Sequence, residues 1–258
     1  MSAPPRLHYD VHPGQGPWLL LLHGFLSSRA QWADNLESLG RFCRPVTAEL
    51  WGHGRSPSPT DPAAYGIDGY NAQLEILRAE LAAGRWFVCG QSFAAGLALR
   101  YGLSHPQALS GLIVTNSVSA FTQPTEDQAA RSKADAIEAG GHDTLRALPQ
   151  YPRAGSRLSD RVNQGLAADA AFLSPAGIAN GLRYTAGALA IGPGLADLTV
   201  PTLLVNGRWE KAFQPLRAVV ERRSKAIDVV DLEGGHAINA EAPAEFERAV
   251  GRFLQTHT

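Results

Sequence analysis

The sequence predicts an α/β fold: a mostly parallel, doubly wound β-sheet with helices on both faces and an inserted helical cap. Two observations carry this prediction. Short apolar runs alternate with segments in which apolar residues recur every three or four positions, which is the pattern of strands joined by crossover helices. A long segment, residues 120–194, interrupts this alternation with helical patterns alone.

The expected strands are short apolar runs, and the first of them is the clearest. Residues 17–22 are almost wholly apolar and stop at His23 and Gly24, as expected for a strand that is buried on both faces. The further expected strands are residues 46–50, 86–90, 112–115, 202–206 and 227–232.

Helical periodicity fills the segments between these strands. The expected helices are residues 69–83, 94–103, 214–223 and 243–254. Because strand and helix alternate along the chain, we expect parallel strands with right-handed crossovers.

The segment 120–194 is too long for a plain loop and contains helical stretches at residues 126–139 and 175–188. We therefore predict a core domain formed by residues 1–119 and 195–258, with residues 120–194 inserted as a helical cap over an active site. The alternative is a second packed helical layer without a functional role.

Size and charge limit the classes of function. The 258 residues, 45% of them hydrophobic, suit one α/β domain, and the formal net charge is −1 with both signs scattered along the chain. This gives no electrostatic reason to expect nucleic acid or a membrane as a partner. We expect a small-molecule substrate, a monomer or homodimer, and a cytoplasmic location, because no apolar run marks the N-terminus.

The two cysteines, Cys43 and Cys89, lie in apolar stretches and are expected to be buried free thiols. A cysteine nucleophile is the alternative, and it would need an activating group nearby.

The sharpest motif is Gly90-Gln91-Ser92-Phe93-Ala94, where an expected strand runs directly into an expected helix. Such a turn strains the backbone of the serine and lifts its hydroxyl out of the sheet, so small residues are needed two positions before and after it. Gly90 and Ala94 meet this need, and Ser92 is the predicted nucleophile.

Three more segments complete a resemblance. His23-Gly24-Phe25 follows the first strand, Trp-Gly-His-Gly-Arg-Ser occupies residues 51–56, and Gly-Gly-His-Ala occupies residues 234–237. Together with the Ser92 motif they resemble the α/β-hydrolase superfamily across nearly the whole chain outside the cap. The resemblance implies an α/β-hydrolase fold and a serine hydrolase that needs no cofactor.

The resemblance also implies site residues. The backbone N–H groups of Phe25 and Phe93 correspond to the two donors that bind the oxyanion in this family. His236, on the loop after the last expected strand, corresponds to the general base. We also place Trp51, Gln91 and Trp209 at the substrate pocket.

The acid that orients the histidine is expected a few residues beyond the strand 202–206, where Glu210 occupies the place usual for aspartate. The loop after the preceding strand offers only the uncharged Asn116. The alternatives are that Glu210 pairs with Arg208 or Lys211 at the surface, leaving a dyad or another carboxylate such as Asp231.

Residues 49–56 resemble the family's Asp-x-x-Gly-x-Gly-x-Ser turn, with Glu49 in place of the aspartate, and are expected to have a structural role. The sequence has no metal-ligand spacing, dinucleotide fingerprint or phosphate loop, so we expect neither a cofactor nor a metal.

The predicted reaction is hydrolysis of a carboxylic ester or lactone through an acyl-enzyme. Acyl thioesters and the carbon–carbon bond of a vinylogous diketone remain alternative substrates, and a small-molecule receptor is the alternative outside enzymes. Dehalogenases and epoxide hydrolases use an aspartate nucleophile, which Ser92 disfavours. A cap arginine could hold a substrate carboxylate, and the candidates are Arg131, Arg146, Arg153, Arg157, Arg161 and Arg183.

Overall fold

The computed structural model describes residues 5–123, 128–153 and 157–258. Its sheet has seven strands in the order β1-β3-β2-β4-β5-β6-β7, and all neighbours pair in parallel except β1 and β3. The strands are β1 Tyr9–Val11, β2 Trp18–Leu22, β3 Arg44–Ala48, β4 Trp86–Gly90, β5 Leu109–Thr115, β6 Thr202–Gly207 and β7 Ile227–Leu232. The predicted mostly parallel α/β sheet is confirmed.

Strands β1, β3 and β5 differ most from the sequence prediction, and β5 begins three residues earlier than expected, at Leu109. Strand β1 was not predicted because it has only three residues, is half exposed at the sheet edge, and pairs antiparallel with β3. Strand β3 begins two residues earlier than expected, at Arg44, because its start aligns with Trp18 of β2 despite the proline that follows.

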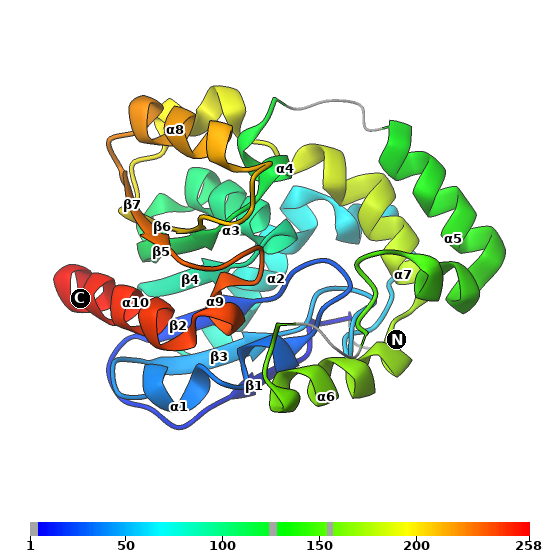
Figure 1. Cartoon of the computed structure of the whole chain (residues 1–258), viewed down its shortest axis with the longest axis horizontal. Helices are drawn as coiled ribbons and strands as arrows, with labels where there is room; N and C mark the ends of the chain where they lie inside the picture. Colours follow the sequence, from blue (N-terminus) through cyan, green and yellow to red (C-terminus); the bar gives the residue numbers. More distant parts are fainter. Residues whose placement is uncertain (1–4, 124–127, 154–156) are drawn as a thin grey trace.

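Helices cover both faces of the sheet. Those of the core are α1 Leu36–Leu39, α2 Ile67–Glu80, α3 Phe93–Ser104, α8 Gln214–Arg223, α9 Ile238–Glu241 and α10 Pro243–His257. Helices α2, α3 and α8 pack on one face, and α1 and α10 pack on the other, as Figure 1 shows. The doubly wound arrangement is therefore confirmed.

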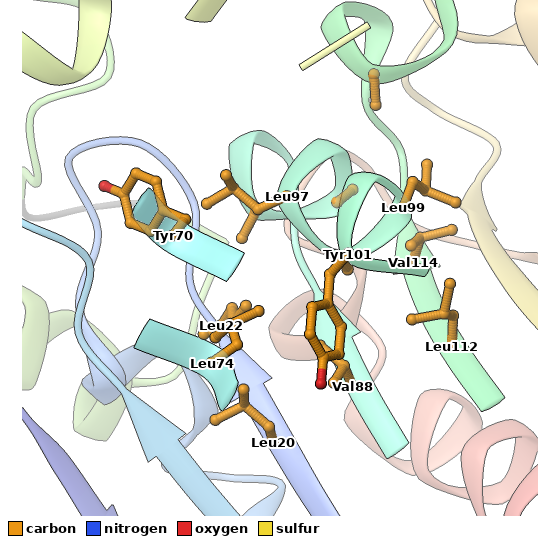
Figure 2. Packing of buried hydrophobic residues seen from close by; sticks show 14 of the residues in the cluster. Leu20, Leu22, Tyr70, Leu74, Val88, Leu97, Leu99, Tyr101, Leu112 and Val114 are labelled. Atoms are coloured by element: carbon orange, nitrogen blue, oxygen red, sulfur yellow. The ribbon is translucent and has the colours of Figure 1, made fainter. Parts of the chain in front are cut away.

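Alternation of side chains along the strands divides the core into two layers. In β2, Leu20 and Leu22 face α2 and α3, whereas Leu19 and Leu21 face α10. Figure 2 shows the first layer, in which Leu20 and Leu22 lie near Leu74 of α2. Because both faces are buried, the strands read as continuous apolar runs in the sequence.

Helices fill the connection between β5 and β6. They are α4 Val118–Phe121, α5 Gln128–Ala147, α6 Asp160–Asp169 and α7 Pro175–Asn180, followed by a π-helical turn at Gly181–Thr185. Helices α5, α6 and α7 gather at one end of the sheet, on the right of Figure 1. Apolar residues of α5, α7 and the turns on either side of α7 form a cluster separate from the two core layers, and Leu26 of the core joins it.

These helices differ in detail from the expected ones. The start of the expected helix 126–139 lies outside the described residues, and α5 runs on to Ala147 with a break at Gly141, where φ is +58°. The expected helix 175–188 is α-helical only to Asn180. The division into a core of residues 1–119 and 195–258 and a cap of residues 120–194 stays a prediction.

Within the described parts of the chain, no helix combines the length and the apolar character needed to cross a membrane.

Candidate active site

Ser92 lies on the sharp turn between β4 and α3. Its φ of 54° and ψ of −112° fall outside the regions that side-chain-bearing residues usually adopt. The turn is possible because Gly90 has no side chain: a Cβ there would lie 2.1 Å from the carbonyl oxygen of Ala94. Strand and helix thus meet closely, and the Ser92 side chain is left half exposed above the sheet.

Three side chains from separate parts of the sequence form a chain of hydrogen bonds. The Nε2 atom of His236 lies 2.7 Å from Oγ of Ser92, and its Nδ1 atom lies 2.8 Å from Oε1 of Glu210. The side chain of His236 is 51% exposed and that of Glu210 is 18% exposed. This geometry lets the imidazole accept the serine proton while the carboxylate holds the Nδ1 proton.

The ends of β5, β6 and β7 hold Glu210 in place. The side chain of Asn116, just after β5, donates to the carbonyl oxygen of Gly207 at 2.9 Å and accepts from the N–H of Gly207 at 2.8 Å. The N–H of Trp209 donates to the carbonyl oxygen of Gly234 at 2.9 Å. The Asn116 side chain therefore supports the segment that carries Glu210, and its hydrogen bonds go to Gly207 and not to the His236 ring.

The side chains named as alternative partners or alternative acids have other contacts. Asp231 binds Arg217 at 2.9 Å and accepts a hydrogen bond from Asn206 at 2.8 Å. Arg208 pairs with Glu233 at 2.9 Å and leaves Glu210 to His236.

The loop that carries His236 is held by two side chains. Glu241 accepts the N–H of Gly235 at 3.0 Å and the N–H of Ala237 at 3.1 Å, and thus binds the backbone on both sides of the histidine. Gln91 donates to the carbonyl oxygen of His236 at 3.0 Å. Glu241 was not predicted from the sequence. The feature that could have indicated its role is its position five residues after His236, close to the start of a helix.

The backbone N–H group of Phe25 lies in the loop after β2, and that of Phe93 belongs to the first residue of α3, directly after Ser92. Within the described residues, neither group is paired with a protein acceptor. The two segments meet closely, because a Cβ on Gly24 would lie 2.2 Å from the side-chain oxygen of Gln91 and 3.3 Å from Cβ of Ser92. Two free donors beside the serine could bind a developing oxyanion.

Two buried histidines fix the loop after β2. The N–H of Leu26, whose φ is +57°, donates to Nε2 of His53 at 3.2 Å, and the N–H of Leu50 donates to Nε2 of His23 at 3.1 Å. Both rings must be neutral to accept these bonds at Nε2. Burial lowers the pKa of His23 to about 4 and the pKa of His53 to about 3.

Glu49 closes the turn of residues 49–56. Its Oε2 atom accepts the N–H of Arg55 at 2.7 Å, and a Cβ on Gly54 would lie 2.0 Å from Oε1. Burial raises the pKa of Glu49. These contacts lie within the turn, as expected for a structural role.

Two cavities meet at the reactive groups, and Phe25, Ser92, Gln150 and His236 line both. The larger, of about 520 Å³, lies under α4, α5 and the turns that follow α7; its other lining residues are Phe93, Ser117, Val118, Ser119, Thr122, Gln123, Lys133, Leu182, Ala186, Gly187, Leu189, Ala190 and Glu210. The smaller, of about 220 Å³, is also lined by Gly24, Ser27, Gln31, Gln91, Leu158, Leu166, Ala237 and Ala240.

Of the three residues expected at the substrate pocket, one lines a cavity beside Ser92 and two do not. Gln91 lines the smaller cavity. Trp51 is 1% exposed in the core layer under α2, and its indole N–H donates to the carbonyl oxygen of Ala64 at 3.0 Å. Trp209 is 50% exposed, and its indole N–H donates to Glu233 at 3.0 Å. Neither tryptophan is among the described residues that line the two cavities, so their place at the substrate pocket stays a prediction.

None of the six cap arginines is among the described residues that line these two cavities, but Arg153 lines a third cavity of about 400 Å³ that shares Phe25 and Gln150 with both. Arg183 binds Asp135 at 2.7 Å and Glu138 at 2.9 Å, and Arg157 lies over the Trp209 ring. Among the described residues that line the larger cavity, Lys133 of α5 carries the cationic side chain, and no sequence motif pointed to it.

The two cysteines are free and buried. Burial raises the pKa of Cys43 to about 12 and also raises the pKa of Cys89. Neither lines a cavity beside the reactive histidine. Within the described residues, no cluster of histidine, cysteine or carboxylate side chains could hold a metal ion.

The fold and this trio of side chains define a class of proteins, those that place a serine on a strand-to-helix turn at the top of an α/β sheet. The sequence profile of the α/β hydrolase fold family matches residues 17–243, and the chain belongs to this family.

Three relatives illustrate the similarity. RutD of Rhizobium rhizogenes, named as a proposed carbamate hydrolase, is 26% identical over 264 residues, which cover 98% of this chain and 99% of RutD. The pimeloyl-[acyl-carrier protein] methyl ester esterase of Nitrosomonas europaea is 32% identical over 110 residues, or 43% of this chain and 41% of the esterase. The crystal structure of the enol-lactonase from Burkholderia xenovorans LB400 superposes with a TM-score of 0.81 at 21% identity over 96% of each chain. These names support the prediction of a hydrolase enzyme.

Proposed function

We propose that this chain is a serine hydrolase that cleaves a carboxylic ester or lactone of a small molecule through an acyl-enzyme. Ser92 is the nucleophile, His236 the general base and acid, and Glu210 the carboxylate that orients the imidazole. The observation that carries this proposal is the unbroken line of hydrogen bonds from Ser92 through His236 to Glu210, at 2.7 and 2.8 Å. It lies where two cavities meet.

In the first half of the reaction, the Oγ–H proton of Ser92 passes to Nε2 of His236 as Oγ forms a bond to the carbonyl carbon. The carbonyl π electrons move to its oxygen, which then accepts hydrogen bonds from the N–H groups of Phe25 and Phe93. When the carbonyl re-forms, the bond to the leaving oxygen breaks, and His236 gives its proton to that oxygen. The products of this half are an acyl-serine and an alcohol.

Water completes the cycle. His236 takes a proton from water as its oxygen attacks the acyl carbon, and the same two N–H groups receive the second oxyanion. Collapse breaks the bond to Ser92, which recovers its proton from His236. The net change is ester plus water to acid plus alcohol, and in a lactone both products remain one molecule.

The substrate class is supported by the neutral serine nucleophile, which excludes the carboxylate chemistry of dehalogenases, and by relatives named esterase and enol-lactonase. The site would lie between the core and the helices of residues 120–194, which we propose act as the cap. Acyl transfer of this kind also serves thioesters and activated carbon–carbon bonds, so only substrates separate these reactions.

The test is a screen of short 4-nitrophenyl esters, lactones, acyl thioesters and ring-cleavage diketones with the wild-type protein and Ser92→Ala. We expect ester or lactone turnover that disappears in the variant, together with loss of fluorophosphonate labelling. Labelling that persists in Ser92→Ala refutes the nucleophile. Turnover confined to thioesters or diketones refutes the substrate class, and tight ligand binding without any turnover identifies a receptor.

A further inference from the structure

The two cavities that meet at Ser92 differ in chemistry. Both are lined by Ser92 and His236, so the serine lies at their junction. Apart from His236, the described residues that line the smaller cavity have neutral side chains, and Leu158 and Leu166 are among them. The two parts of a substrate on either side of the scissile bond would therefore meet different surroundings.

The described lining of the larger cavity contains one lysine and several neutral hydrogen-bond donors. Lys133 is half-buried, and it lies beside the stripe of α5 residues Ala130, Ala134 and Ile137 that packs into the cap cluster. Hydroxyl and amide groups accompany it on the wall: those of Ser119, Thr122 and Gln123.

No carboxylate among the described residues neutralises this lysine. The two nearby carboxylates of α5, Asp135 and Glu138, both bind Arg183. The carboxylate in the cavity wall, Glu210, is hydrogen-bonded to Nδ1 of His236. A half-buried ammonium without a carboxylate partner is an unused positive charge, and burial from water strengthens its attraction for an anion.

We propose that Lys133 binds an anionic group of the substrate, so that the enzyme prefers esters whose acyl part ends in a carboxylate. The charged acyl part occupies the larger cavity, and the neutral leaving group occupies the smaller one. This inference rests on the proposed function, because it assigns the acyl and leaving sides of a bond attacked by Ser92.

The experiment compares two esters of the same size and leaving group, 4-nitrophenyl hydrogen glutarate and 4-nitrophenyl glutaramate. They differ only in a terminal carboxylate against a terminal amide. The quantity measured is the ratio of their kcat/KM values on one protein preparation, which does not depend on the fraction of folded enzyme. The proteins are wild type, Lys133→Met, Lys133→Arg and the matched control Arg131→Met, which removes an exposed cation two residues away on the same helix.

We expect the wild type and Arg131→Met to prefer the anionic ester by about tenfold, the lower range for a charge-assisted contact, because Lys133 is only half-buried. Lys133→Met should bring the ratio near one, and Lys133→Arg should keep most of the preference. A wild-type ratio at or below one, or a ratio that Lys133→Met leaves unchanged, overturns the inference while ester turnover itself upholds the proposed function.

Binding supplies a readout that does not require turnover. Calorimetry on Ser92→Ala compares monomethyl glutarate with methyl glutaramate, and the double variant Ser92→Ala/Lys133→Met repeats the comparison. Preferential binding of the anion that is lost with the lysine supports the inference even if no ester is hydrolysed. Equal binding of the two ligands to Ser92→Ala overturns it.

Discussion

Replacing Glu210 by glutamine removes a negative charge from the imidazole and keeps the size of the side chain. The carboxylate oxygen Oε1 lies 2.8 Å from Nδ1 of His236, while Oε2 is buried without a hydrogen-bond partner among the described residues. A glutamine amide has two orientations here. With its nitrogen facing Nδ1, it donates to the ring and forces the other tautomer, which cannot accept the Ser92 proton.

With its oxygen facing Nδ1, the amide keeps the tautomer but buries an unpaired NH2 group at the Oε2 position. Both orientations lose the charge that stabilises the imidazolium formed during attack. A charge-assisted hydrogen bond is roughly twice as strong as a neutral one, and the tautomer penalty adds to this loss. We expect kcat/KM to fall by roughly 10² to 10⁴, mostly in kcat.

The assay is steady-state hydrolysis of a short 4-nitrophenyl ester, with circular dichroism to verify folding. Glu233→Gln is the matched control, because Glu233 is an exposed carboxylate that binds Arg208 and Trp209 and does not touch His236. Turnover of Glu210→Gln within a few-fold of the control would refute the assignment of Glu210 and reopen the search for the acid.

Three further predictions follow from contacts at the same site. Gly90→Ala should lower both thermal stability and fluorophosphonate labelling, because its Cβ would lie 2.1 Å from the carbonyl oxygen of Ala94; a melting temperature and labelling rate equal to wild type would contradict this. Glu241→Leu, which loses the acceptors for the N–H groups on both sides of His236, should lower kcat by about tenfold with a smaller change in KM, and the kcat of Glu241→Gln should lie between those of wild type and Glu241→Leu. Equal kcat in all three proteins would exclude this positioning role. His23 and His53 have lowered pKa values of about 4 and about 3, so the unfolded chain binds more protons than the native one below pH 6.5. Stability is therefore full above pH 6.5 and falls as pH drops toward these folded values, by about 2 kcal/mol per histidine at pH 5. Urea midpoints at pH 7.5 and 5 would measure this fall, and a variant with phenylalanine at both positions should show a smaller one.

The sheet and the nucleophile turn could be predicted because their signals are local. Strand β4 begins and ends where the apolar run does, and the need for a small residue at Gly90 follows from backbone sterics alone. Strand β1 could not be predicted, since its three residues are ordered by pairing with β3 and carry little apolar pattern of their own.

Residues of the candidate site could be predicted where a sequence motif contains them. They could not be predicted where only tertiary packing brings them to the site. Glu241 accepts hydrogen bonds from the backbone of its own loop, and this contact leaves no pattern in the sequence beyond an acidic residue near a helix. Lys133 reaches the larger cavity because of how α5 packs on the core, which no local pattern reveals. An aromatic residue within a family motif can belong to the core as well as to a pocket, and the buried ring of Trp51 packs near Tyr70.

Leu26 connects two parts of the molecule that a protein engineer would want to exchange separately. It follows Phe25 directly, and its side chain is buried in the apolar cluster of the helices between β5 and β6. Grafting the corresponding helices of another family member onto this scaffold would give the Leu26 side chain different neighbours and would displace the adjacent N–H group of Phe25, which we propose binds the oxyanion. A functional chimera should therefore carry residue 26 along with the transplanted helices.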